Sequence, residues 1–321
     1  MKRGARIYVA GHSGLAGSAI VRALERTGHT GLLLRGHAEL ELADAAAVRS
    51  FYERERPEYV IIAAARVGGI LANQTYAAEF IHQNLAIVLN VVHEAWRTGV
   101  RRLLYLGSSC IYPRDCPQPM KEEHLLSGPL EFSNRAYSVA KIAGVELCWS
   151  YNRQHGTKFL AAMPTNLYGP GDHYDLQTSH VLPALIRKVH EAKQRGDSEV
   201  VVWGSGRPRR EFLYSDDLGE ACAHLMSLPD REFNRAVAPE AAPMVNVGAG
   251  TDLTIAELAA LVAEVLGYRG RFVHDSSKPD GTPRKLLDSS RVATLGWKPR
   301  VALREGIGLA YQDFLHRAST G

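Results

Sequence analysis

One glycine-rich segment near the N-terminus constrains the fold of this chain more than any other part of its sequence. It reads Gly11-His12-Ser13-Gly14-Leu15-Ala16-Gly17, follows a short apolar run at residues 6–10, and opens a predicted helix that reaches about residue 26. In such a unit Gly11 allows a tight turn, Gly14 lets the backbone approach a pyrophosphate, and Gly17 lets the helix pack against the strand. The phosphates would lie at the N-terminus of the helix. The segment therefore predicts a dinucleotide-binding unit.

The end of the second predicted strand indicates which nicotinamide cofactor binds. An acidic residue there would bind the 2′-hydroxyl of the ribose, whereas a cation accommodates a 2′-phosphate. The strand at residues 31–34 is followed by Arg35 and His37, and no carboxylate occurs this early. We therefore expect NADP(H). The preference over NAD(H) is expected to be modest, because Ser13 and His37 are weaker phosphate ligands than arginine.

A hydroxyl, a phenol and an ammonium group form a second informative set. Ser108 follows a predicted strand at residues 102–106, while Tyr137 and Lys141 stand four residues apart in a predicted helix at residues 137–155 and share one face of it. A phenol has a pKa of about 10, so an adjacent ammonium that favours its anion would let it exchange a proton near neutral pH. We expect Ser108 to bind a substrate oxygen and Lys141 to reach the cofactor ribose, which suits hydride transfer to a ketone. The alternative is a tyrosine and a lysine on a solvated helix face.

Strands and helices alternate along the chain, as a doubly wound α/β fold requires. Further strands are predicted at residues 59–63, 159–163, 199–202, 211–214 and 244–247, and further helices at 80–99, 180–195, 217–226 and 253–266. We expect a Rossmann-type parallel sheet that carries Ser108 at its C-terminal edge, where ligands bind. The NADP-binding domain would comprise residues 1–169, with returning segments at about 211–226 and 244–250. A smaller, discontinuous α/β substrate-binding domain would comprise residues 170–321.

Composition and charge exclude several classes of protein. The 321 residues are 45% hydrophobic, and 38 lysines and arginines are scattered among 34 acidic residues, so we expect a globular chain with no nucleic-acid partner. No apolar run approaches the roughly 18 residues of a membrane span, so no membrane partner is expected. The cysteines lack metal-binding spacing, so we expect no metal, and the cytoplasm is the simplest compartment. They are Cys110, Cys116, Cys148 and Cys222.

Motifs from residue 6 to about residue 314 resemble the extended short-chain dehydrogenase/reductase family, in particular its members that epimerise and reduce GDP-linked deoxysugars. Two motifs are more specific than the glycine fingerprint and the Tyr-x-x-x-Lys pair, namely Gly107-Ser108-Ser109-Cys110 and Ser179-His180-Val181. Others are Val67-Gly68-Gly69-Ile70, Pro164-Thr165-Asn166-Leu167-Tyr168-Gly169-Pro170 and Val202-Trp203-Gly204-Ser205-Gly206. The second domain would accordingly bind a nucleotide sugar.

This resemblance implies an NADP-dependent oxidoreductase that is also an epimerase. The implied reaction is 3,5-epimerisation and 4-keto reduction of GDP-4-keto-6-deoxy-D-mannose to GDP-L-fucose. Formation of GDP-L-colitose is the nearest alternative, because it would use the same residues on a substrate that lacks the 3-hydroxyl. Another nucleotide-deoxysugar epimerase/reductase is a further alternative. A non-catalytic NADP(H)-sensing protein is remote, because it would be expected to lose Tyr137, Lys141 or the acid–base pair.

The resemblance makes Cys110 and His180 the candidates for base and acid. Inversion beside a ketone needs a base on one face, an acid on the other, and stabilisation of the enolate oxygen. A thiol becomes a usable base when a cation lies nearby, and histidine titrates near neutrality. Ser108 and Tyr137 would polarise the 4-keto oxygen, and Tyr137 would supply its proton after hydride transfer. Outside this motif, Cys110 would be interpreted as a buried apolar residue and His180 as a packed or surface residue.

The resemblance also implies binding residues and a homodimer. For the nucleotide end of the GDP-sugar we expect Lys188, Trp203 and Arg210. Asp280 would bind the ribose or the sugar, or is only a turn residue. The helices at residues 80–99 and 137–155 of two subunits would form a four-helix bundle. The implied cofactor contacts are Gly11, His12, Ser13, Gly14, Leu15, Ala16, Gly17, Arg35, His37, Ala64, Leu106, Gly107, Lys141, Pro164, Asn166, Leu167 and His180.

Overall fold

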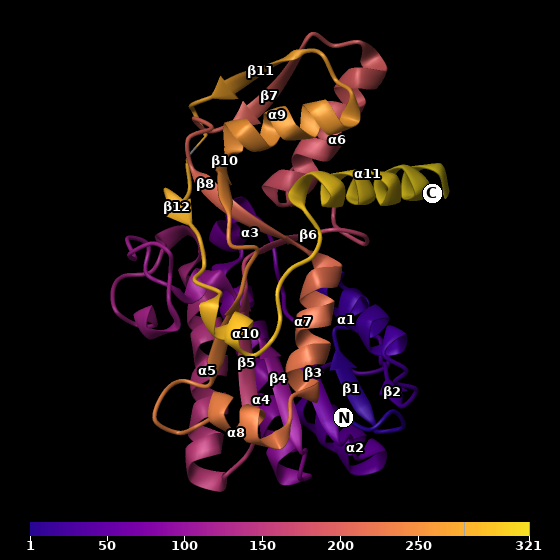
Figure 1. Ribbon diagram of the computed structural model, residues 1–321, viewed down its shortest axis with the longest axis vertical. Helices are drawn as coiled ribbons and strands as arrows, with labels where there is room; N and C mark the ends of the chain where they lie inside the picture. Colours follow the sequence, from indigo (N-terminus) through magenta and orange to yellow (C-terminus); the bar gives the residue numbers. More distant parts are fainter. Residues whose placement is uncertain (279, 321) are drawn as a thin grey trace.

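A six-stranded parallel sheet forms the centre of the larger part of the molecule, as the computed structural model shows (Figure 1). The structure describes residues 1–278 and 280–320. In spatial order the strands are β2 (Leu32–Leu33), β1 (Ile7–Ala10), β3 (Tyr59–Ile62), β4 (Arg102–Leu106), β5 (Phe159–Pro164) and β9 (Met244–Val247). The strand order reverses between β1 and β3, and in such sheets ligands bind in the crevice at this switch point. The fold is therefore the predicted doubly wound α/β class.

Helices cover both faces of this sheet, so five of its strands are fully buried, and only the edge strand β2 is partly exposed. Side chains alternate between the faces, with Tyr8, Val60 and Leu103 in one core and Val9, Ile61 and Leu104 in the other. The first core contains α2 (Ala45–Glu55), α4 (Ala77–Arg97) and α5 (Arg135–His155); the second contains α1 (Leu15–Arg26), α7 (Ser215–Ser227) and α8 (Asp230–Ala236). Because the inner strands pack against helices on both faces, they are mostly apolar runs, which is how the sequence predicted them.

The smaller part of the molecule lies above the C-terminal edge of the large sheet in Figure 1. Its central strand β8 (Arg209–Tyr214) pairs with β6 (Asn166–Tyr168), β10 (Asp252–Thr254) and β12 (Arg284–Lys285). A separate parallel pair consists of β7 (Glu199–Trp203) and β11 (Arg271–Asp275). Helices α6 (Val181–Arg195), α9 (Ile255–Leu266) and α11 (Leu303–Thr320) pack with these strands around a third core. No helix among the described residues is long and apolar enough to cross a membrane.

One extended segment, residues 284–289, joins the two parts, and we call it the strap. It begins as β12 in the small sheet and ends beside β9 of the large sheet. Its main chain forms hydrogen bonds with Met120, whose N–H donates to Leu286 O (2.8 Å) and whose carbonyl accepts from Asp288 N–H (2.8 Å). The strap therefore fixes the small sheet against the C-terminal edge of the large one.

Candidate active site

The glycine segment forms a turn too tight for side chains at two of its positions. Gly11 has a φ of +80°, and a Cβ on Gly17 would lie 2.0 Å from the Gly11 carbonyl oxygen. Gly14 caps α1, no side chain caps the helix, and its first turn contains no acidic residue. His12 Nδ1 is buried without a hydrogen-bond partner. The free N–H groups, the helix dipole and the absence of a competing carboxylate fit the pyrophosphate of a dinucleotide.

Two alanine variants should separate the packing role of the turn from its binding role. Gly17→Ala places a methyl group against backbone, so we expect it to lower both the melting temperature and NADPH affinity, the latter at least tenfold. Gly14→Ala meets its nearest atom at 3.6 Å, so the melting temperature should stay within about 2 °C while NADPH affinity still falls because the methyl group obstructs the phosphates. NADPH fluorescence titration and thermal melting measure both effects. Wild-type NADPH affinity in Gly14→Ala would place the phosphates elsewhere.

Arg35 and His37, the residues expected at the ribose 2′-phosphate, lie after β2, and each is beside a carboxylate. Arg35 forms an ion pair with Glu55 (2.9 Å), and His37 Nε2 lies 2.7 Å from Glu41. Arg35 also donates a hydrogen bond to the carbonyl of Leu34. A 2′-phosphate would therefore compete with Glu55 for Arg35. Such competition would make the preference for NADP(H) over NAD(H) modest.

Ser108, Tyr137 and Lys141 come together at the C-terminal end of β4. Ser108 caps the short helix η1 (Ser109–Ile111), and its Oγ accepts from the Cys110 N–H at 3.3 Å. Lys141 is buried on α5, donates to the carbonyl of Leu106 (2.7 Å) and lies 5.6 Å from the centroid of the Tyr137 ring. Burial lowers the pKa of Lys141 to about 8, although Cys110 opposes the shift. The predicted strand end and helix face thus place these groups close to one another.

The expectation that Lys141 lowers the pKa of Tyr137 is wrong. Burial and the neighbouring Cys110 raise the pKa of the phenol, against a hydrogen bond with Ser108 that lowers it. The Lys141 ammonium is directed at a backbone carbonyl instead. Tyr137 is therefore a neutral phenol across the neutral pH range, the state from which it can donate a proton to a substrate oxygen.

A neutral amide and an ammonium group lie beside the sulfur of the partly buried Cys110. Asn134 Nδ2 lies 3.2 Å from its sulfur and Lys285 Nζ lies 3.5 Å from it. Burial raises the pKa of the thiol, but Lys285, the hydrogen bond with Ser108 and the charge of Arg210 together outweigh burial, and the pKa is lowered. The cation that a catalytic thiol needs is therefore present. Sequence reasoning missed Lys285, since it is 175 residues from Cys110 and belongs to no recognisable spacing.

His180 is the N-cap residue of α6, and the charge of Lys285 acts on it. Its side chain is accessible to solvent, yet protein atoms surround it closely enough that burial lowers the pKa of the imidazole. The charges of His173 and Lys285 lower the pKa further. Lys285 thus acts electrostatically on both candidate acid–base residues.

The four residues expected at the nucleotide form two neighbouring pairs. Lys188 Nζ lies 4.9 Å from the centroid of the Trp203 ring, at the end of β7. Asp280 accepts hydrogen bonds from the Ser205 N–H (2.8 Å) and hydroxyl (2.6 Å), and the charge of Arg210 acts on it. Because Ser205 follows Trp203 by two residues, the pairs are adjacent.

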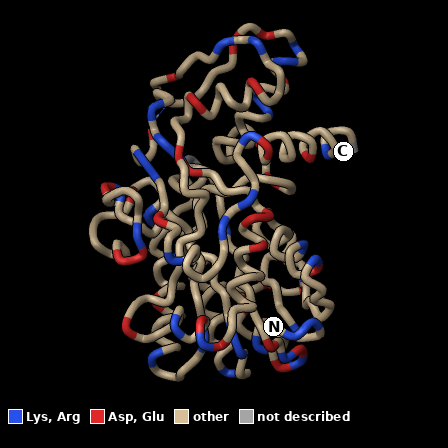
Figure 2. Tube along the Cα trace, viewed as in Figure 1, with Lys and Arg blue, Asp and Glu red and all other residues tan. Residues whose placement is uncertain are grey.

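Figure 2 shows acidic and basic residues interspersed over the molecule.

The remaining expected cofactor contacts surround the same crevice. A Cβ on Gly11 would lie 2.6 Å from Ala64, so the loops after β1 and β3 touch. Asn166 Nδ2 donates to the Glu211 carbonyl (2.7 Å), which ties the end of β5 to β8. Leu106 and Pro164 end β4 and β5, Gly107 follows β4 directly, and Leu167 lies in β6. The carboxyl ends of parallel strands are where folds of this class bind a dinucleotide.

Comparison with known proteins finds relatives along nearly the whole chain. The pattern of the NAD dependent epimerase/dehydratase family matches residues 7–248. GDP-L-fucose synthase 1 of Arabidopsis thaliana is 53% identical over 98% of this chain and 94% of its own length, and GDP-L-fucose synthase of Escherichia coli K12 is 51% identical over 97% and 96%. GDP-L-colitose synthase of Yersinia pseudotuberculosis is 36% identical over 97% and 98%. The crystal structure of a GDP-L-fucose synthetase from Naegleria fowleri bound to NADP superposes with a TM-score of 0.86 at 27% identity, covering 100% of this chain and 97% of the other.

The fold and the crevice define the class of protein: a nicotinamide-dependent oxidoreductase built on a Rossmann sheet, with a serine, a tyrosine and a lysine beside the cofactor site. The Naegleria fowleri neighbour is bound to NADP, the cofactor that the sequence predicts for this chain. The chain belongs to the NAD dependent epimerase/dehydratase family, and within it to the GDP-L-fucose synthases.

Proposed function

We propose that the protein converts GDP-4-keto-6-deoxy-D-mannose to GDP-L-fucose, by epimerisation at C3 and C5 and reduction at C4. One observation supports this above all: Cys110, whose sulfur lies 3.5 Å from Lys285 Nζ and whose thiol pKa is lowered, is next to Ser108 and Tyr137. Reduction of a ketone needs no such thiol, whereas removal of a proton beside the ketone needs a base of this kind. The relatives named GDP-L-fucose synthase support the same reaction.

In the proposed epimerisation, the Cys110 thiolate removes a proton from the carbon beside the ketone, and His180 returns a proton to the opposite face. Hydrogen bonds from Ser108 and Tyr137 stabilise the charge that develops on the keto oxygen. A solvent proton restores His180, and the Cys110 proton leaves to solvent before the second carbon reacts. In reduction NADPH supplies the hydride to C4, and the neutral phenol of Tyr137 gives its proton to the oxygen.

We propose that Lys188, Trp203, Arg210 and Asp280 bind the GDP portion, with Arg210 on the diphosphate and the indole against a base or sugar face. We propose an NADP-binding domain at residues 1–169, with returning segments, and a nucleotide-sugar-binding domain at residues 170–321 that contains these four positions. The topology corrects its bounds: residues 166–168 and 211–214 pair as β6 and β8 in the small sheet, and α8 packs in a core of the large sheet. We also propose the cytoplasm as the compartment, because Cys110 must stay a reduced thiol to act as a base.

The test is to supply GDP-4-keto-6-deoxy-D-mannose in deuterated water with NADPH, and separately with NADH, and to identify the product by NMR. GDP-L-fucose with deuterium at C3 and C5 supports both epimerisations and the reduction. GDP-L-colitose formation is the second candidate, favoured by the 36% identical relative, and it is tested with the substrate that lacks the 3-hydroxyl. Efficient turnover of that substrate alone would replace the first proposal by the second.

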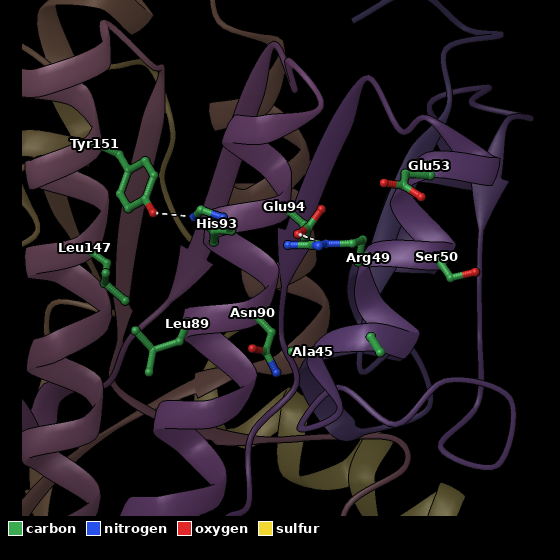
Figure 3. Close-up of a pocket in the computed structure, with 11 residues that line it drawn as sticks. Ala45, Arg49, Ser50, Glu53, Leu89, Asn90, His93, Glu94, Leu147 and Tyr151 are labelled. Atoms are coloured by element: carbon green, nitrogen blue, oxygen red, sulfur yellow. Dashed lines mark hydrogen bonds and ion pairs between the residues drawn. The ribbon is translucent and has the colours of Figure 1, made fainter.

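We further propose a homodimer formed by α4 and α5 of each subunit. A groove of about 630 Å³ runs across α2, α4 and α5. Figure 3 shows its lining, with Leu89, Asn90 and His93 on α4, Leu147 and Tyr151 on α5, and Arg49, Ser50 and Glu53 on α2. Leu89 is 48% exposed, and His93 Nδ1 lies 2.9 Å from the Tyr151 hydroxyl. Helices that present apolar side chains in this way fit a four-helix bundle.

The dimer can be tested by one charge substitution. Leu89→Arg should halve the mass measured by light scattering, because it would bury an unpaired charge in the bundle. Leu315→Arg is the matched control, since Leu315 is 39% exposed on α11, outside the proposed interface. A dimer that survives Leu89→Arg at micromolar concentration would place the interface elsewhere.

A further inference from the structure

We propose that Lys285 is the positioning residue of the epimerisation chemistry: its ammonium contacts the Cys110 sulfur and stabilises the thiolate that removes the sugar protons. This inference rests on the proposed function. It adds a residue from the small sheet to a reaction whose other acid–base groups follow β4, lie on α5 or precede α6. The observations that carry it are the contact itself, the direction of β12 and the anchoring of the strap.

The register of β12 directs Lys285 into the pocket. Lys285 pairs with Arg210, and Arg284 pairs with Arg209, in the parallel ladder between β12 and β8. Side chains alternate along a strand, and Arg284 is bound on the other side by Asp252, with its Nε 2.5 Å from Oδ2. Lys285 therefore faces the active site, where its Nζ lies 3.5 Å from Cys110 Sγ.

The strap holds that contact through buried groups. The Glu211 side chain is fully buried on β8 and accepts hydrogen bonds from the N–H groups of Leu287 (3.0 Å) and Gly250 (2.7 Å). Gln118 Oε1 accepts from the Leu286 N–H at 2.9 Å. The main chain on the C-terminal side of Lys285 is thus fixed at two successive positions. In the described part of the chain no carboxylate lies within ion-pairing distance of Lys285, so its charge is not neutralised by an acidic partner.

The charges that face Cys110 come from several elements. Lys285 on β12 and Arg210 on β8 favour its anion, whereas burial disfavours it. On α5, the charge of the thiolate acts to raise the pKa values of Tyr137 and Lys141. At α6, the charge of Lys285 lowers the pKa of His180. Removal of Lys285 should therefore raise the pKa values of both Cys110 and His180. Loss of a residue with only a structural role would not shift the pKa values of Cys110 and His180 in the same direction.

The experiment measures Cys110 directly in the NADP⁺-bound enzyme. Alkylation of Cys110 by iodoacetamide is followed against pH by peptide mass spectrometry in wild type, Lys285→Met and Lys285→Arg, with Cys110→Ser to confirm the site. We expect the alkylation midpoint to rise by at least one pH unit in Lys285→Met, with about tenfold slower alkylation at low pH, and to be largely restored in Lys285→Arg. Lys158→Met, at the opposite edge of the large sheet beside Asp230, should match wild type.

The pH profile of deuterium exchange into the sugar gives a second readout. The wild-type profile should be bell-shaped, with one limb set by the lowered pKa of Cys110 and the other by the lowered pKa of His180. The bell shape does not depend on which of the two groups titrates at the lower pH. Both limbs should move to higher pH in Lys285→Met. An alkylation midpoint unchanged in a folded Lys285→Met protein would overturn the proposal, even if turnover were lost. Failure of the wild type to turn over the GDP-sugar would refute the proposed function, while the alkylation profile would still report the contact.

Discussion

Tyr137→Phe should slow NADPH oxidation by about 10²- to 10⁴-fold while leaving deuterium exchange at C3 and C5 within about tenfold of wild type. The phenol is held neutral by burial, so it is the proton donor to the C4 oxygen in the proposed reduction. During epimerisation the same oxygen keeps its hydrogen bond to Ser108. Loss of the phenol therefore removes the proton donor of the reduction. In the epimerisation it removes only one of the two hydrogen-bond donors to the oxygen, because Ser108 remains.

Two rates, measured in separate reactions of one enzyme preparation, test this expectation: the absorbance decay of NADPH, and deuterium incorporation followed by NMR with NADP⁺ in place of NADPH. Tyr311→Phe is the control, because the Tyr311 hydroxyl lies 2.9 Å from His190 Nδ1 on α6, away from the pocket. It should change neither rate by more than about twofold. Equal losses of reduction and exchange in Tyr137→Phe would contradict the role assigned to the phenol.

Cys110→Ser should lower deuterium exchange at C3 and C5 by about 10²- to 10⁴-fold. Serine keeps the size and the hydrogen bonding of the side chain, but Lys285 cannot ionise an alcohol near neutral pH as it can a thiol. Reduction of a substrate supplied with its C3 and C5 centres already inverted should stay within about tenfold, since the Ser108, Tyr137 and Lys141 set is unchanged.

Cys116→Ala is the matched control for that substitution. Cys116 is buried, burial raises the pKa of its thiol, and its sulfur lies 3.1 Å from His124 Nδ1. We expect a lower melting temperature and exchange within about threefold of wild type. Exchange at the wild-type rate in Cys110→Ser would show that another group is the base.

The features predicted correctly from the sequence are those encoded locally. The glycine segment, the strand before it and the helix after it lie within one short stretch, and so do the Tyr137 and Lys141 positions on α5. Helix α2 was not predicted, because its alanine-rich start carries little periodicity; Asp44 caps it by accepting from the N–H groups of Ala46 and Ala47. No strand was predicted at residues 166–168, and they form β6 because β8 supplies a partner strand.

The features that were missed depend on contacts between distant segments. Lys285 reaches Cys110 only because β12 pairs with β8, and Glu211 supports it only because the strap returns across both sheets. The wrong expectation for the Tyr137 phenol has the same origin. Helix spacing places Lys141 beside it, but burial and the direction of the ammonium are decided by the packing of α5 on β4.

The path of the chain between the two parts limits how such an enzyme can acquire a new sugar specificity. Strand β9 belongs to the large sheet and β10 to the small one, and the strap crosses back before α11 returns to the small part. A single recombination point between two relatives would therefore leave one of the sheets with strands from both parents. Exchange of the sugar-binding half would need several simultaneous junctions. Point substitutions in an intact scaffold are the more accessible route, and directed evolution of this protein should target individual pocket residues rather than shuffled segments.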